Sequence, residues 1–138
     1  MAAEQGATPE IISNQGSAIS FGDYETEKKQ KADGYEVAGD IYSVKTHNEV
    51  TRLEKNGSLL FESVPGSAVR GFVIGERTVS FSAQGAGDTR ITLGLEAETG
   101  YHITIGDTVG SAKSNLSGKV SFSAELSKEP LAVFIEKI

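Results

Sequence analysis

The sequence has 138 residues, with 13 Lys and Arg against 19 Asp and Glu, and it contains no Cys and no Trp. This length fits one domain with an ordinary hydrophobic core. The net charge of −6 argues against nucleic acid or an anionic membrane as the main partner, because both are bound through clustered positive charge. Without Cys, the chain has no disulfide, thiolate zinc site or cysteine nucleophile. No stretch approaches the roughly 20 apolar residues of a membrane span.

The N-terminal region differs from the rest of the chain in composition. Residues 1–20 are poor in large apolar side chains, which predicts a flexible arm or linker before a single domain over residues 21–138. Apolar residues at 11–12 and 19–21 are exceptions that could dock on the body. Residues 1–6 lack the basic and apolar segments of a signal peptide. We therefore expect a cytoplasmic protein if the sequence is complete, and an extracellular one if an export signal has been removed.

The highly charged stretch over residues 22–34 predicts a polar connection or an edge strand, with a short solvated helix over residues 25–31 as the alternative. Runs of alternating apolar and polar residues then predict short β-strands. These runs cover residues 35–37, 41–45, 49–55, 58–64, 77–83, 89–95, 101–105 and 119–126. Asn56 and Gly57 lie between two of the runs and predict a type I′ hairpin turn, which needs positive φ at both central residues.

The last apolar run, residues 131–135, is apolar on both faces and is predicted to be a central strand. Roughly eight or nine short antiparallel strands predict an all-β sandwich, immunoglobulin-like or jelly-roll-like, with a barrel as the alternative. The alternation places these side chains in the core: Val79, Phe81, Ile91, Leu93, Ile103, Ile105, Val120, Phe122, Leu126, Val133 and Ile135.

The sequence contains no recognisable catalytic or metal-binding motif. It has only two histidines, His47 and His102, and His102 is predicted to face outward from a strand. A histidine zinc site would need carboxylates to complete it. The carboxylates at predicted turns are Asp23, Glu25, Asp88, Glu96, Glu98 and Asp107. A glycosidase needs two carboxylates in an open cleft, for which a sandwich with tight turns has little room. We therefore expect no enzyme activity, no cofactor and no metal.

The candidate ligand-binding residues are Tyr42, Lys45, His47 and Arg52, predicted to share a polar face beside the charged segment at residues 23–31. An aromatic ring beside hydrogen-bond donors suits a glycan, although the favoured stacking residue, Trp, is absent. The other tyrosines that could contact a sugar are Tyr24, Tyr35 and Tyr101. For an acidic glycan, the cations that could supply donors are Lys45, Arg52, Arg70 and Arg90.

Residues 42–57 and 59–66, with residues 21–24 and 114–119, resemble a group of short proteins of anaerobic gut bacteria that often carry the label endosialidase. The resemblance covers residues 21–138 and implies a connection with glycans. True endosialidases are far larger enzymes with arginine-lined, multi-domain sites, and none of their catalytic residues maps onto this chain. The second half also resembles, in pattern, the immunoglobulin-like accessory modules of bacterial surface proteins and polysaccharide-degrading enzymes.

Three functions are compatible with these features. The first is a non-catalytic module of a bacterial protein that binds a glycan or another surface component. The second is a structural protein that assembles with itself through strand edges, with the N-terminal arm adding a strand to a neighbour. The third is a small glycan hydrolase. An exposed tyrosine in a groove would favour the first, an arm packed into a partner's sheet the second, and a deep pocket with facing carboxylates the third.

Overall fold

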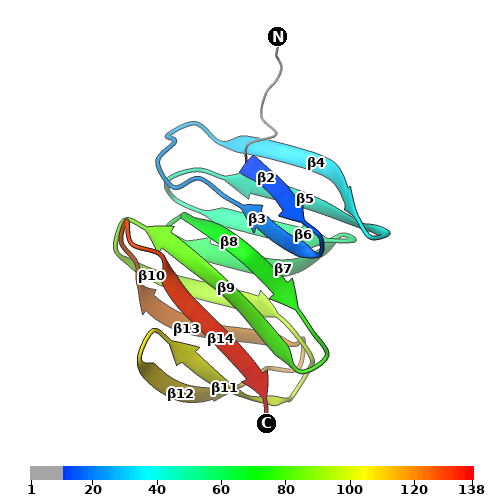
Figure 1. Cartoon of the computed structure of the whole chain (residues 1–138), viewed down its shortest axis with the longest axis vertical. Helices are drawn as coiled ribbons and strands as arrows, with labels where there is room; N and C mark the ends of the chain where they lie inside the picture. The colour runs from blue at the N-terminus through cyan, green and yellow to red at the C-terminus, as the bar shows by residue number, and fades with distance from the viewer. Residues whose placement is uncertain (1–10) are drawn as a thin grey trace.

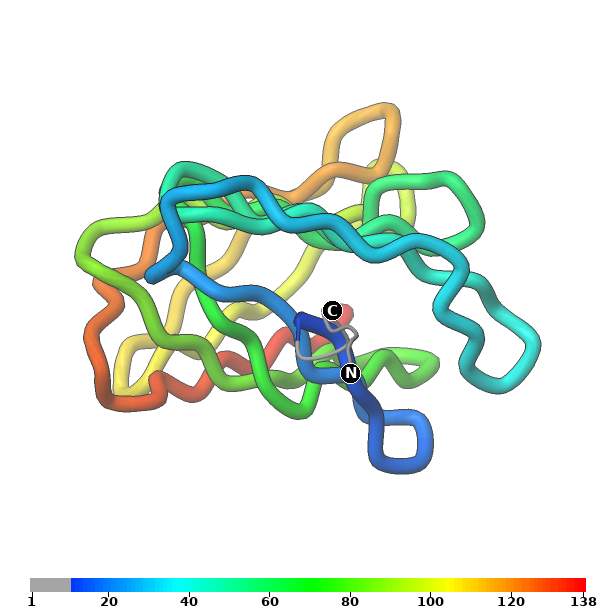
Figure 2. Tube along the Cα trace, turned by 90° about the horizontal axis from the view of Figure 1, so that it is seen from above, coloured from blue at the N-terminus to red at the C-terminus, as the bar shows by residue number. Residues whose placement is uncertain are grey.

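A computed structural model describes residues 11–138, which form two antiparallel sheets packed face to face (Figures 1 and 2). One sheet has six strands in the order β13-β10-β7-β6-β5-β4, and the other has seven in the order β12-β11-β14-β9-β8-β3-β2. The strands are β2 (Ile12–Gln15), β3 (Ala18–Phe21), β4 (Gln30–Val37), β5 (Asp40–Thr46), β6 (Thr51–Lys55), β7 (Ser58–Val64), β8 (Ser67–Ile74), β9 (Thr78–Gly85), β10 (Asp88–Gly94), β11 (Gly100–Ile105), β12 (Thr108–Lys113), β13 (Lys119–Glu125) and β14 (Leu131–Lys137). The predicted all-β sandwich is confirmed.

Local sequence explains much of this strand pattern. Strands β4 to β7 are consecutive neighbours in one sheet, joined by tight hairpins. At the turn between β6 and β7, Asn56 has φ 51° and Gly57 has φ 85°, so the predicted type I′ conformation is confirmed. From β9 onward, the connections from β9 to β10, β10 to β11, β12 to β13 and β13 to β14 cross between the sheets.

The prediction of a flexible arm is wrong for residues 11–20, while residues 1–10 lie outside the described part. Strands β2 and β3 form a hairpin at one edge of the seven-stranded sheet, where β3 pairs with β8. Ile12, Ile19 and Phe21 are buried, so the apolar exceptions in this polar region do dock on the body. The polar composition misled the prediction because a short edge hairpin needs only one apolar face.

The sequence patterns also missed β8 and β12. A register shift in β8 between Arg70 and Val73 interrupts its alternation, and β12 contains small and polar residues that are almost all exposed. The charged stretch contributes the edge strand β4, which begins at Gln30, and no helix forms there. Strand β14 is an interior strand, as predicted, and it lies between β9 and β11, although Phe134 on its outer face is 43% exposed.

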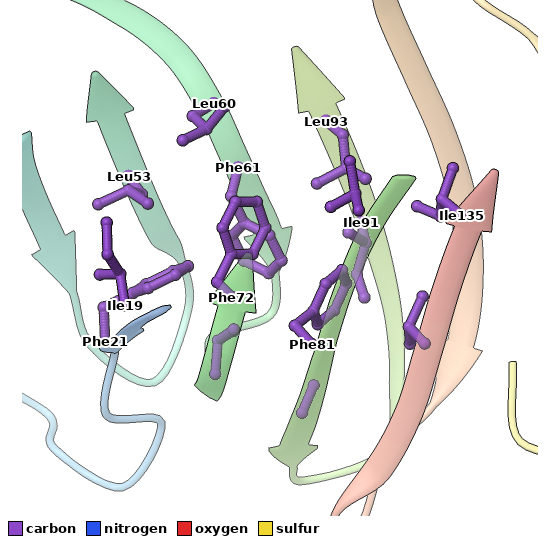
Figure 3. Packing of buried hydrophobic residues seen from close by; sticks show 14 of the residues in the cluster. Ile19, Phe21, Leu53, Leu60, Phe61, Phe72, Phe81, Ile91, Leu93 and Ile135 are labelled. Carbon is purple, nitrogen blue, oxygen red and sulfur yellow. The ribbon is translucent and has the colours of Figure 1, made fainter. Parts of the chain in front are cut away.

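The core lies between the sheets and is organised around four phenylalanines. Phe61 is fully buried and makes edge-to-face contacts with Phe21, Phe72 and Phe81, with ring centroids 5.1, 6.1 and 5.7 Å away. Figure 3 shows these rings beside aliphatic residues from both sheets. The predicted core residues are buried except Phe122 and Ile105, which are partly buried against the cluster. No helix in residues 11–138 is long and apolar enough to cross a membrane.

Candidate functional site

The structure brings together two of the four predicted site residues. Lys45 on β5 and Arg52 on β6 are directly opposite each other on the outer face of the six-stranded sheet, and Lys31 on β4 is opposite Lys45. Arg52 bridges Glu54 and Glu62, with nitrogen–oxygen distances of 3.1 Å to each. His47 lies in the loop after β5, where its backbone N–H donates to the carbonyl of Val50.

Tyr42 does not share this face. Its side chain is 8% exposed and points between the sheets, together with Val44 and Thr46, whereas Lys45 points outward. The prediction that Tyr42 and Lys45 share a polar face is therefore wrong. The physical reason is strand periodicity, since residues three positions apart on a regular strand lie on opposite faces.

The outer-face cations line a small hollow of about 170 Å³. Lys31, Lys45 and Arg52 are accompanied there by the carboxylates of Asp33 and Glu54. Lys31 pairs with Asp33 at 3.4 Å and Arg52 pairs with Glu54, so the anions already offset two of the three positive charges. Glu62 adds a further negative charge on Arg52. This hollow is therefore a weak site for an anion, and no tyrosine among residues 11–138 lines it.

A larger groove lies between the two sheets at the end of the sandwich, and its lining includes residues of the turns after β6 and β8. It consists of two adjoining hollows, of about 330 and 160 Å³, which share Lys55, Leu60 and Ile74 in their linings. We call these two hollows together the end groove. Its apolar lining comes from both sheets and comprises Ile19, Val37, Leu59, Leu60, Phe72, Ile74, Val79, Leu95 and Ile135.

Each hollow of the end groove is lined by one buried tyrosine. Tyr101 on β11 is 5% exposed and lines the larger hollow, and Tyr42 lines the smaller one. The Tyr101 oxygen accepts a hydrogen bond of 3.2 Å from the backbone N–H of Glu96, which leaves its own proton free to donate. The Tyr42 hydroxyl has no hydrogen-bond partner within residues 11–138. Both tyrosines therefore bring hydrogen-bonding capacity to the lining of the end groove.

Charged side chains surround the mouth of the end groove. Lys137 pairs with Glu96, and Lys55 pairs with Asp40 at 3.6 Å. Arg77, in the turn after β8, is exposed, and its Nη2 donates a hydrogen bond of 2.9 Å to the carbonyl oxygen of Lys137. In the described part of the chain, Arg77 forms no ion pair. One hydrogen bond therefore positions its guanidinium at the groove, and its remaining donors are available for an anionic or hydroxyl-rich ligand.

Sequence reasoning named Tyr42, Tyr101 and Glu96 as candidates but did not bring them together, and it did not single out Arg77. The missed signal is that the turns after β4, β6, β8 and β10 all lie at the same end of the molecule, because these strands run in the same direction. Charged residues in or next to those turns, such as Asp40, Arg77 and Glu96, can therefore surround a common groove.

Within the described residues, no group of three or more His, Asp or Glu side chains is placed to hold a metal ion. Comparisons of the chain with known protein families, curated proteins and solved structures found no match.

Proposed function

We propose that the protein is a non-catalytic binding module that holds a short segment of glycan in the end groove. The observation that carries this proposal is the pair of buried tyrosines, Tyr42 and Tyr101, whose hydroxyls keep unused hydrogen-bonding capacity in adjoining hollows. A neutral hydrogen bond to such a hydroxyl contributes about 0.5–1.5 kcal/mol. A hydroxyl-rich ligand that enters the groove would supply the missing partners.

The shape and lining of the end groove fit a sugar chain better than a purely apolar molecule. The larger hollow, about 330 Å³, is at the lower end of the usual size of a ligand pocket, and the smaller one extends it to a second position. Apolar side chains such as Leu60 and Ile74 offer contacts for the C–H faces of sugar rings. An apolar ligand would fill the same space but would give no partner to the Tyr42 hydroxyl and no acceptor to the Tyr101 proton.

The charges at the mouth favour a carboxylated sugar over a neutral one. Lys55 and Lys137 are each paired with a carboxylate, so neither is a strong site for a further anion. Arg77 has no such partner within residues 11–138, and a guanidinium binds a carboxylate through two parallel hydrogen bonds. This preference agrees with the glycan connection that the sequence resemblance implies.

Isothermal titration of the purified chain with short uronic-acid or sialic-acid oligosaccharides, and with neutral oligosaccharides of the same length, tests the proposal. Loss of one neutral hydrogen bond corresponds to roughly a two- to tenfold change in affinity, and loss of a charged one to roughly ten- to a hundredfold. Tyr42→Phe should therefore weaken binding of both ligand classes modestly. Arg77→Gln should weaken binding of the acidic ligands strongly and of the neutral ones little.

Arg90→Gln is the matched control, because Arg90 is exposed on β10 and does not line the end groove. It should leave both affinities unchanged. The proposal fails if no oligosaccharide binds, or if binding is unaffected by both groove variants. Turnover of a glycan by the purified chain would contradict the non-catalytic part of the proposal.

A further inference from the structure

We propose that two copies of this chain associate through antiparallel pairing of their β12 edges, which would join their seven-stranded sheets into one continuous sheet. Strand β12 pairs with β11 on one side, and no other described strand is hydrogen-bonded to it on the other. Figure 1 shows it at the outer margin of the sheet, at the far end from β2. An uncovered strand edge presents unpaired N–H and C=O groups, which is a template for another strand.

The other three edge strands carry features that hinder such pairing, and in β13 the feature lies at the first residue of the strand. Strand β2 has only four residues, and β4 has a register shift between Ala32 and Tyr35 together with charged side chains. The start of β13 is covered by the preceding loop. There, the Asn115 N–H donates to the carbonyl of Lys119 at 3.1 Å, and the Asn115 side chain accepts from the Lys119 N–H at 2.9 Å. Short edges, bulges, charges and covering loops are the usual protections of an edge strand.

Strand β12 has none of these protections over its first five residues. It runs from Thr108 to Lys113 with no proline and no register shift, and Lys113 at its end is its only charged residue. Five of its six residues are exposed, and Val109 is 68% exposed. The strand is therefore open along its free edge and over most of both faces, with Ala112 alone packed against the core, and a second strand could lie alongside it.

Hairpin geometry fixes which backbone groups point outward. Ile105 and Thr108 flank the two-residue turn between β11 and β12 and form its first pair. In a two-residue hairpin this first pair is hydrogen-bonded, and the bonded pairs then alternate along the ladder. Thr108 and Gly110 therefore point their backbone groups toward β11, whereas Val109, Ser111 and Lys113 point theirs outward. Suppose that two β12 strands pair antiparallel with Gly110 at the centre. Val109 of one copy then lies opposite Ser111 of the other, and the outward N–H and C=O groups of these two residues face each other.

The charges at the two ends of β12 complement each other in that same register. Asp107 lies in the turn just before the strand, and Lys113 is its last residue. Gly110 is midway between them in sequence, so the antiparallel arrangement brings Asp107 of one copy beside Lys113 of the other, twice per dimer. Neither side chain forms an ion pair with any residue from 11 to 138. This symmetry is the reason to propose a second copy of the chain as the occupant, since a two-fold interface uses the same patch on both partners.

Sedimentation equilibrium of the full chain tests the proposal, with protein concentrations from about 10 μM to about 1 mM to cover the affinities of small interfaces. The unaltered chain should show a reversible monomer–dimer equilibrium. Lys113→Glu places like charges together at both ends of the interface and should weaken the dimer about tenfold or more. Lys128→Glu makes the same change at an exposed loop position away from β12 and should have no effect.

The double variant Asp107→Lys/Lys113→Glu exchanges the two charges and restores both complementary pairs. It should recover the dimer to within a few-fold of the unaltered chain, which a general loss of folding could not produce. A chain that remains monomeric throughout this range overturns the proposal. So does a dimer that Lys113→Glu leaves intact, or one that the double variant fails to recover. These outcomes are independent of whether the end groove binds a glycan, because neither residue lines it.

Discussion

Tyr42 shows how the alternation of side chains between the two faces of a strand decides the role of a single residue. An aromatic residue three positions before a lysine suggested one mixed surface, but on β5 the two side chains point to opposite faces. Tyr42 consequently lines the end groove from inside, and its hydroxyl lacks a hydrogen-bond partner among the described residues. The alternation of β5 alone was sufficient to predict this placement. The groove itself was not predictable, because it depends on how the two sheets pack.

Replacing Tyr42 with Phe should lower the affinity for a glycan without lowering the stability of the fold. The substitution removes only a hydroxyl that has no hydrogen-bond partner within residues 11–138, so the free energy of unfolding should change by less than about 1 kcal/mol. Glycan affinity should fall, as argued above. Urea denaturation of both proteins measures the first effect. A loss of more than about 1 kcal/mol would mean that the hydroxyl already has a partner that stabilises the fold.

A substitution at Gly57 tests the geometry of the turn between β6 and β7. Its φ of 85° is a conformation that favours glycine, and no atom lies within 4 Å of the place where a Cβ would be. Gly57→Val should therefore destabilise the protein through backbone strain alone, by about 1–3 kcal/mol. Gly87→Val, at a position that is also open but has no positive φ, is the matched control. Equal unfolding free energies for the two variants would rule out the strained turn.

At the scale of elements, buried hydroxyls connect strands that the hydrophobic pattern alone does not connect. Thr46 on β5 and Thr51 on β6 share a hydrogen bond of 2.7 Å, and Thr51 also bonds the backbone of Ser67 at the start of β8, as acceptor and as donor. The Ser67 hydroxyl is in turn 2.7 Å from that of Ser63 on β7. These contacts join the two sheets at the end opposite the end groove, and all four residues are fully buried.

Replacing Thr51 with Val keeps the shape of the side chain but removes its hydroxyl. Several buried groups, including the Ser67 N–H, then lose a partner, so the unfolding free energy should fall by about 1–3 kcal/mol. Thr92→Val provides the comparison, because the Thr92 hydroxyl bonds Ser121 on the partly exposed outer face. That variant should change the unfolding free energy by less than about 0.5 kcal/mol. Similar losses in chemical denaturation would contradict a special role for the buried cluster.

The elements that the sequence predicted well are those with long, regular alternation, such as β9, β10 and β13. The ones it missed are short or interrupted. Strand β2 has four residues, β8 contains a register shift, and β12 is exposed on both faces, so none of them shows a clean period of two. A strand pattern also contains no information about its neighbours in the sheet. For this reason the sandwich was predictable, but the uncovered β12 edge was not.

At the scale of the whole molecule, Phe61 links the two sheets. It contacts Phe21 on β3, Phe72 on β8 and Phe81 on β9, all of which belong to the opposite sheet (Figure 3). Phe61→Ala should lower the unfolding free energy by about 3–5 kcal/mol, a large part of a typical total of about 5–15 kcal/mol. Phe134→Ala removes the same ring from an outer face where it is 43% exposed. If thermal denaturation shows equal losses for both variants, the cluster does not join the sheets.

The central claim is that one end of this sandwich holds a ligand between the sheets, and not on the outer face where the sequence first suggested it. Nuclear magnetic resonance titration of isotope-labelled protein with an acidic oligosaccharide tests this most directly, because it maps contacts without any substitution. We predict that the largest chemical-shift changes fall on Tyr42, Arg77 and Tyr101. Changes concentrated instead on Lys45 and Arg52, with the end groove unaffected, would contradict the claim.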